Sequence, residues 1–135
     1  MKLRRMIFQV QVDSPKQVIP IDLLLPGDAL QCNGIQALIS GVFPSFREAI
    51  PNFGEYSLEF SGHLIHPIHA QVPYINPSSL TQENYHRIGI IPLDVSLTDN
   101  KLVTGYYRDL DEQANERSAE FMPYSVKFIF QLLVP

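Results

Sequence analysis

Three histidines follow one another at spacings of three, at positions His63, His66 and His69. Three imidazoles form a ligand set that zinc accepts. Along a strand, however, residues three apart point to opposite faces, so His66 faces away from the other two. Pro67 also prevents a regular helix from bringing all three together. We therefore predict no metal site and no cofactor, and we rank a metal-dependent β-barrel enzyme that uses these histidines third among the candidate functions.

The other groups capable of catalysis are isolated. Glu55 and Glu59 lie four residues apart in an expected strand, about 13 Å by rise alone, and are predicted to be solvated rather than to act as a glycosidase pair. Cys32 is the only cysteine, and no nucleophile signature surrounds it, which indicates a small core residue. Residues 109–120 carry acidic side chains at calcium-loop spacing, but Ala114 stands where the sharp turn needs glycine. With no Gly-rich phosphate loop either, the sequence predicts a protein that is not an enzyme.

Tyrosine and arginine gather in two places that favour binding instead of catalysis. Tyr74 lies near Tyr85 and Arg87, and Tyr107 adjoins Arg108. These residue types are enriched in protein interfaces because they combine large contact area with hydrogen-bonding tips. The same clusters would stack on sugars, but the chain has no tryptophan. We therefore predict that these five residues bind protein partners, self-association included, and we place glycan binding second.

Composition restricts the class of protein further. The chain has 135 residues, which suits one domain over residues 1–135, and 18% of them are charged, below the usual ~25%. Weakly charged surface is easier to bury against a partner. A net charge of −4 provides no overall field for phosphate backbones, so we expect no general nucleic-acid binding. A lone cysteine allows no internal disulfide and fits a reducing compartment.

The basic start of the chain, with Lys2, Arg4 and Arg5, has the charge of a signal-peptide n-region. Residues 6–12 then alternate apolar side chains with glutamine, which is a strand pattern and not a continuous apolar h-region. No run approaches the ~18 apolar residues of a membrane span. We expect no signal peptide, no membrane span, and a location in the cytoplasm or within an assembled particle.

Short strand patterns recur along the whole chain, separated by prolines and glycines. Alternation or apolar runs predict strands over these segments: 6–12, 17–25, 28–39, 55–60, 87–106 and 125–134. Residues 63–75 are apolar but broken by Pro67 and Pro73, so they belong at an edge, a bulge or a bend. No repeat, low-complexity tract or linker divides the chain.

Two dipeptides predict β-hairpins. Asn33-Gly34 is a strong signal for a two-residue turn and places Cys32 opposite Ile35. Asp99-Asn100 predicts a second turn, which places Thr98 opposite Lys101.

The second hairpin also predicts which tyrosine is buried. Its register puts Tyr106 on the side of the apolar residues of the preceding strand, so Tyr107 is expected to point outward. An outward tyrosine beside Arg108 has the composition of an interface anchor.

Helical patterns are sparse. Residues 45–50, 79–87 and 110–121 are the candidates, which allows one or two short helices. Many short strands with few helices predict an all-β fold, an antiparallel sandwich or small barrel of the jelly-roll kind; an α+β fold is the alternative.

The absence of a catalytic set, the low charge density and a short basic arm ahead of the first expected strand favour a structural role. The leading hypothesis is a non-enzymatic structural or assembly subunit that oligomerises or docks into a larger complex, of viral or phage particle type. The alternative is a soluble β-sandwich that binds a glycan or another small ligand. Fold-level analogy supports both ideas, since neither has a sequence motif of its own.

Overall fold

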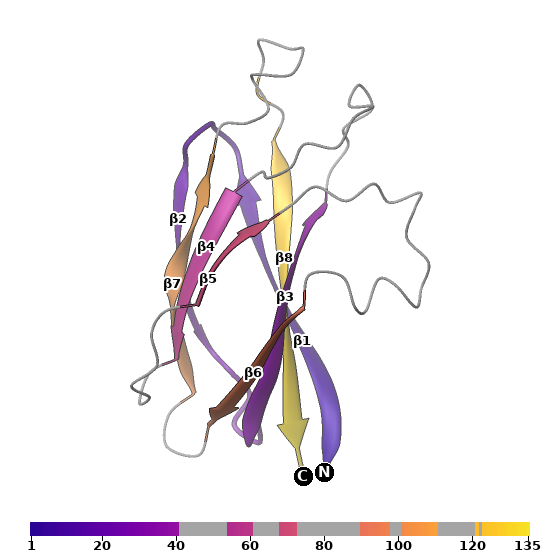
Figure 1. Ribbon diagram of the computed structural model, residues 1–135. Helices are drawn as coiled ribbons and strands as arrows, with labels where there is room; N and C mark the ends of the chain where they lie inside the picture. The colour runs from indigo at the N-terminus through magenta and orange to yellow at the C-terminus, as the bar shows by residue number, and fades with distance from the viewer. Residues whose placement is uncertain (41–53, 61–67, 73–89, 98–100, 111–120, 122) are drawn as a thin grey trace.

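The computed structural model describes residues 1–40, 54–60, 68–72, 90–97, 101–110, 121 and 123–135 (Figure 1). These residues form eight strands and no helix: β1 (Lys2–Val12), β2 (Val18–Leu24), β3 (Gln31–Ser40), β4 (Gly54–Phe60), β5 (Ile68–Val72), β6 (Ile91–Ser96), β7 (Leu102–Asp109) and β8 (Tyr124–Val134). The expected all-β class is confirmed. Within the described ranges no helix is long and apolar enough to cross a membrane.

The strands form two four-stranded sheets that pack face to face. The first sheet has the order β1-β8-β3-β6 and the second β2-β7-β4-β5, and every pairing is antiparallel. Strand β1 thus pairs with β8, β2 with β7, β3 with β6, and β4 with β5. This nested pairing is that of one long hairpin rolled into a sandwich, so the strand order is a jelly roll.

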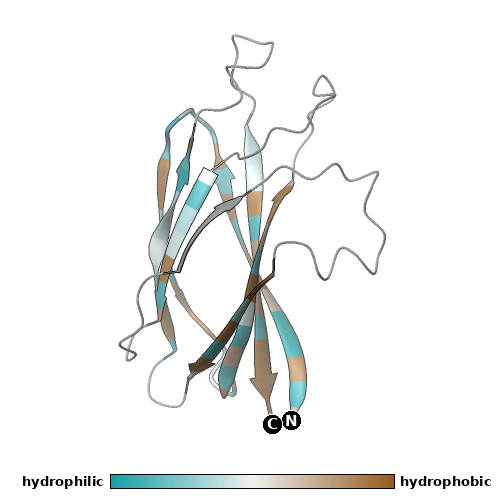
Figure 2. Cartoon of the chain, viewed as in Figure 1, coloured by the Kyte–Doolittle hydropathy of each residue, from teal (hydrophilic) through white to brown (hydrophobic). Residues whose placement is uncertain are grey.

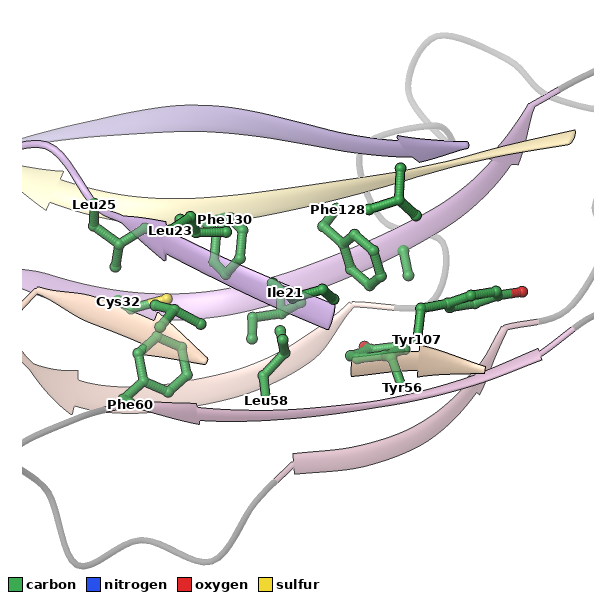
Figure 3. Packing of buried hydrophobic residues seen from close by; sticks show 14 of the residues in the cluster. Ile21, Leu23, Leu25, Cys32, Tyr56, Leu58, Phe60, Tyr107, Phe128 and Phe130 are labelled. Atoms are coloured by element: carbon green, nitrogen blue, oxygen red, sulfur yellow. The ribbon is translucent and has the colours of Figure 1, made fainter. Parts of the chain in front are cut away.

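Alternation along the strands builds the core between the sheets. In β8, every second residue from Tyr124 to Val134 is buried. Figure 2 shows hydrophilic and hydrophobic bands in turn along β1. Figure 3 shows the result, with Phe128 and Phe130 of the first sheet facing Tyr56 and Leu58 of the second. The Tyr56 ring meets Phe128 edge-on, with 5.1 Å between the ring centroids.

The hairpin predicted at Asn33-Gly34 is wrong, because both residues lie inside the single strand β3. The ladders of β3 with β6 and with β8 both shift register between Cys32 and Gly34, which marks a β-bulge. The long strand β8 pairs with β3 on both sides of this point. Pairing with distant strands therefore overrides the local turn preference of Asn-Gly, and the extra residue is absorbed as a bulge.

The hairpin predicted around Asp99-Asn100 is also wrong as a ladder, although residues 98–100 lie outside the described residues. Strand β6 belongs to the first sheet and β7 to the second, so the chain crosses between sheets here. The Lys101 ammonium stabilises this connection between the sheets, since it donates hydrogen bonds to the carbonyl oxygens of Ala29 (2.9 Å) and Leu97 (2.7 Å).

The basic residues near the start do not form an arm ahead of the first strand, because β1 already begins at Lys2. Arg4 is paired with Asp28 through two hydrogen bonds of 3.0 and 2.6 Å. This pair fastens β1 to the connection between β2 and β3.

The remaining expectations fall on segments at or beyond the described ranges. Strand β5, flanked by Pro67 and Pro73, is confirmed as an edge strand among those described. The helix candidates at residues 45–50 and 79–87 lie outside the described residues, as does nearly all of 110–121.

Candidate functional site

Tyr107 is a core residue, so its predicted outward position is wrong. It has no exposed surface and packs edge-on against Tyr124 and Phe128. The prediction carried the inside-outside alternation from β6 through a hairpin into β7. Because the chain instead changes sheets between these strands, the alternation is not transmitted, and half-buried Tyr106 takes the outer position.

A buried hydrogen-bonded chain joins Tyr107 to Tyr124 and Asp109. The Tyr124 hydroxyl donates to the Asp109 carboxylate at 2.5 Å, and the two tyrosine hydroxyls lie 2.8 Å apart. The Tyr124 hydroxyl has a single proton, which it donates in the hydrogen bond to Asp109, so the Tyr107 hydroxyl is the donor in the hydrogen bond to Tyr124. The sequence analysis missed this chain; the only local signal for it is an aspartate two residues after Tyr107, at the end of β7.

Backbone groups next to this hydrogen-bonded chain hold the Asp109 carboxylate in place. The Lys16 amide donates to the second oxygen of Asp109 at 3.0 Å, and the Asp109 amide donates to the Gln17 carbonyl. Lys16 has a φ of 59°, so this turn adopts the left-handed conformation that a non-glycine residue rarely accepts. Gly54 leaves room for the Tyr107 hydroxyl, because a Cβ at this position would clash with it. The tyrosine chain is therefore a built element of the fold.

The protonation states of these groups argue for a structural role. Burial raises the pKa of Tyr107 and, with the neighbouring Tyr107 and Asp109, raises the pKa of Tyr124 even further. Both hydroxyls stay protonated at neutral pH, so neither serves as a base. The hydrogen bonds of this chain instead fix the orientation of the three side chains.

A small pocket of about 250 Å³ opens beside this region, lined by Lys16, Arg108, Asp109 and Leu110. It falls below the ~300 Å³ of ordinary ligand pockets. Arg108, which the sequence analysis assigned to partner binding, is half-exposed and forms an ion pair with Glu55 of β4. The guanidinium is therefore fixed by the protein's own carboxylate.

The isolated catalytic candidates have ordinary positions. Cys32 has no exposed surface, and burial raises the pKa of its thiol to about 11, so the predicted core role is confirmed. Glu59 is exposed as expected, but Glu55 is buried, because its partner Arg108 lies opposite it on β7.

Several predicted site residues cannot be placed by the described structure. Tyr74, Tyr85, Arg87, His63 and His66 lie outside the described residues. The backbone of His69 pairs with Ser57 across the β4–β5 ladder. Among the described residues no group of three or more His, Cys, Asp and Glu side chains is arranged to hold a metal ion.

Large exposed apolar side chains are concentrated in one stretch of the described sequence. All six large exposed hydrophobic residues among those described fall within residues 1–30, and they are Met1, Leu3, Ile7, Val18, Leu24 and Leu30. Leu3 and Ile7 belong to β1, and Val18 and Leu24 to β2. Each of these strands is the outermost described strand of its sheet. Because Val10, Val12, Ile21 and Leu23 are buried, the exposed side chains of β1 lie on the outer face of the first sheet and those of β2 on the outer face of the second. We call the exposed surfaces of these two edge strands together the β1–β2 side.

The outer face of the second sheet continues this surface. Val18 of β2 pairs with Arg108 of β7, and exposed Pro20 pairs with Tyr106. The tyrosine beside the arginine on this face is thus Tyr106 and not Tyr107. An aromatic, an arginine and apolar neighbours are the composition of an interface.

Comparison with known proteins adds no identity. The chain matches no family model, and no curated protein resembles it significantly.

Proposed function

We propose that this protein is a non-enzymatic structural subunit that assembles into a larger particle, of viral or phage type. The observation that carries the proposal is the β1–β2 side. Leu24 is 70% exposed, Ile7 59% and Val18 56%, and all three lie on outermost strands. Burying these side chains against a partner recovers stabilisation that folding alone leaves unused.

The fold and the buried hydrogen-bonded chain of Tyr107, Tyr124 and Asp109 support the same proposal. Eight-stranded jelly rolls build viral capsids, although they also serve as lectins and cupins, so this support is analogy. The two hydroxyls of the buried tyrosine chain are protonated and hydrogen-bonded, and the Cys32 thiol is buried, which supports a structural role for these groups. Tyr106 and Arg108 extend the assembly surface, and Tyr74, Tyr85 and Arg87 remain predicted contacts.

The molecular mass in solution tests the proposal. Sedimentation velocity from about 1 μM to about 1 mM, the range of weak to moderate association, should show a multimer whose population grows with concentration. Substituting Leu24→Ser and Val18→Ser together should reduce association with the fold intact, because both side chains are exposed. A monomer throughout the concentration range would overturn the proposal in favour of a soluble ligand-binding sandwich.

A further inference from the structure

The edges of the two sheets differ in how well they are protected against pairing with another chain. An edge strand presents unpaired backbone groups, and proteins protect it by keeping it short or by adding proline. Among the described strands, β2 contains Pro20, β6 contains Pro92, and β5 has five residues. Strand β1 has eleven residues and no proline. It is the edge most open to a new strand.

The sequence of β1 is suited to pairing with itself. Residues 6–12 carry no charge and no proline and alternate in polarity, which is typical of segments that pair between chains. The exposed charges that flank this segment have opposite signs, Arg5 before it and Asp13 after it. Both lie four residues from Gln9. Opposite charges at equal distances from a centre are self-complementary in an antiparallel arrangement.

We propose that β1 pairs antiparallel with β1 of a second copy about a two-fold axis at Gln9, so that the first sheets of the two chains become one continuous sheet. This inference rests on the proposed function and names its first partner. The contact is isologous, so each residue pair occurs twice.

The register makes specific contacts. Arg5 lies opposite Asp13 of the second copy, on the outer face of the joined sheet. On the inner face Phe8, which is half-buried within one chain, lies opposite Val10. A parallel arrangement would instead place Arg5 beside Arg5, and like charges directly opposite are destabilising. Charge complementarity therefore favours a second copy in this orientation.

Charge reversal at the two flanking positions tests the register. Arg5→Glu and Asp13→Lys each replace attraction by repulsion at both ends of the contact, and we expect the dissociation constant of the dimer to rise about tenfold in each variant at low salt. An equimolar mixture of the two variants should regain the affinity of the parent. In the mixed dimer the introduced glutamate faces the introduced lysine, and native Asp13 faces native Arg5. At about 1 M salt, where screening extends only ~3 Å, the differences should shrink.

Asp94→Lys on β6 is the matched control, since Asp94 is exposed on the opposite edge of the first sheet and the charge change is the same as in Asp13→Lys. This variant should dimerise like the parent. Circular dichroism should show an unchanged fold in all three variants, because each replaced side chain is exposed.

Hydrogen exchange on the unmodified protein provides a second measurement that needs no variant. Backbone amides in residues 6–12 should exchange more slowly at high protein concentration than at low concentration. A parent that stays monomeric at every concentration would overturn both this inference and the proposed function. A parent that associates, with no weakening in either charge variant, no gain on mixing and no slowing of exchange in residues 6–12, would overturn the β1 pairing and leave the proposed function intact.

Discussion

Two regions of the sandwich depart from the usual rule that apolar side chains are buried and polar groups are exposed, and they do so in opposite directions. In the first region, which we call the Asp109 end, the hydroxyls of Tyr107 and Tyr124 and the carboxylate of Asp109 lie buried in a single hydrogen-bonded chain. At the β1–β2 side, large apolar side chains such as Ile7 and Leu24 lie in solvent. The polar groups of the first region have hydrogen-bond partners within the chain, whereas the apolar side chains of the second region are uncovered in the described structure.

This contrast separates folding from assembly. A buried polar group costs free energy unless its hydrogen bonds are made, so the chain from Tyr107 to Asp109 must form for the core to be stable. An exposed leucine contributes little to the folded monomer and gains only when a partner covers it. Substitutions at the Asp109 end should therefore change stability, and those at the β1–β2 side should change association.

The largest expected effect comes from truncating the buried tyrosine. Tyr107→Ala removes a side chain with no exposed surface, and we expect a loss of about 3–5 kcal/mol in the free energy of unfolding, as for other buried aromatic residues. Leu24→Ala on the β1–β2 side should change it by less than about 0.5 kcal/mol. Urea unfolding of monomeric protein at low concentration measures both.

Tyr106→Ala is the matched control for Tyr107→Ala, because it removes the same side chain one residue earlier in β7. Since Tyr106 is only half-buried on the outer face, its truncation should cost clearly less. Equal losses at the two positions would contradict the assignment of Tyr107 to the core.

Local pattern predicted most of the strands but not their arrangement. The expected strand at 125–134 matches β8, and that at 55–60 matches β4, because alternation of polarity is encoded residue by residue. Which strands share a sheet depends on pairing between distant segments, such as β1 with β8. No local signal at Asn33-Gly34 distinguishes a hairpin from a bulge, so the neighbours of β3 decide it.

The site residues were predictable only in part, for the same reason. The sequence places two tyrosines before Arg108, but carrying the inside-outside alternation across a sheet change selects Tyr107 in place of Tyr106 as the outward one. The burial of Asp109 and Glu55 follows from partners on other strands, Tyr124 and Arg108. Local pattern predicts the strand that contains Ile7, but the exposure of Ile7 follows only once β1 is known to be an outermost strand.

The next effect in size concerns the two hydroxyls of the buried chain. Tyr124→Phe removes the donor to a buried carboxylate, and we expect a loss of about 2 kcal/mol in the free energy of unfolding. Tyr107→Phe removes a bond between neutral groups and should cost about 1 kcal/mol. The loss of stability in the double variant should be smaller than the sum of the two single losses, because the Tyr107 hydroxyl already loses its partner in Tyr124→Phe. Strict additivity, measured by urea unfolding, would show that the hydroxyls do not act as one chain.

The contribution of one buried tyrosine to alkaline unfolding is expected to be smaller than the effect of Tyr124→Phe. Burial raises the pKa of Tyr56 from its ordinary value of 10.0 to about 12. The folded state therefore favours the protonated form, and this contribution to stability is fully present below pH 10 and is lost as the pH rises from 10 towards 12. Between about pH 8 and about pH 11 the Tyr56→Phe variant should lose about 1.4 kcal/mol less stability than the parent, because one pH unit above the ordinary value corresponds to that amount. Urea unfolding at the two pH values measures the difference. Losses of equal size in parent and variant would mean that Tyr56 ionises as readily in the folded protein as in the unfolded chain, and its place in the core between the sheets would then be wrong.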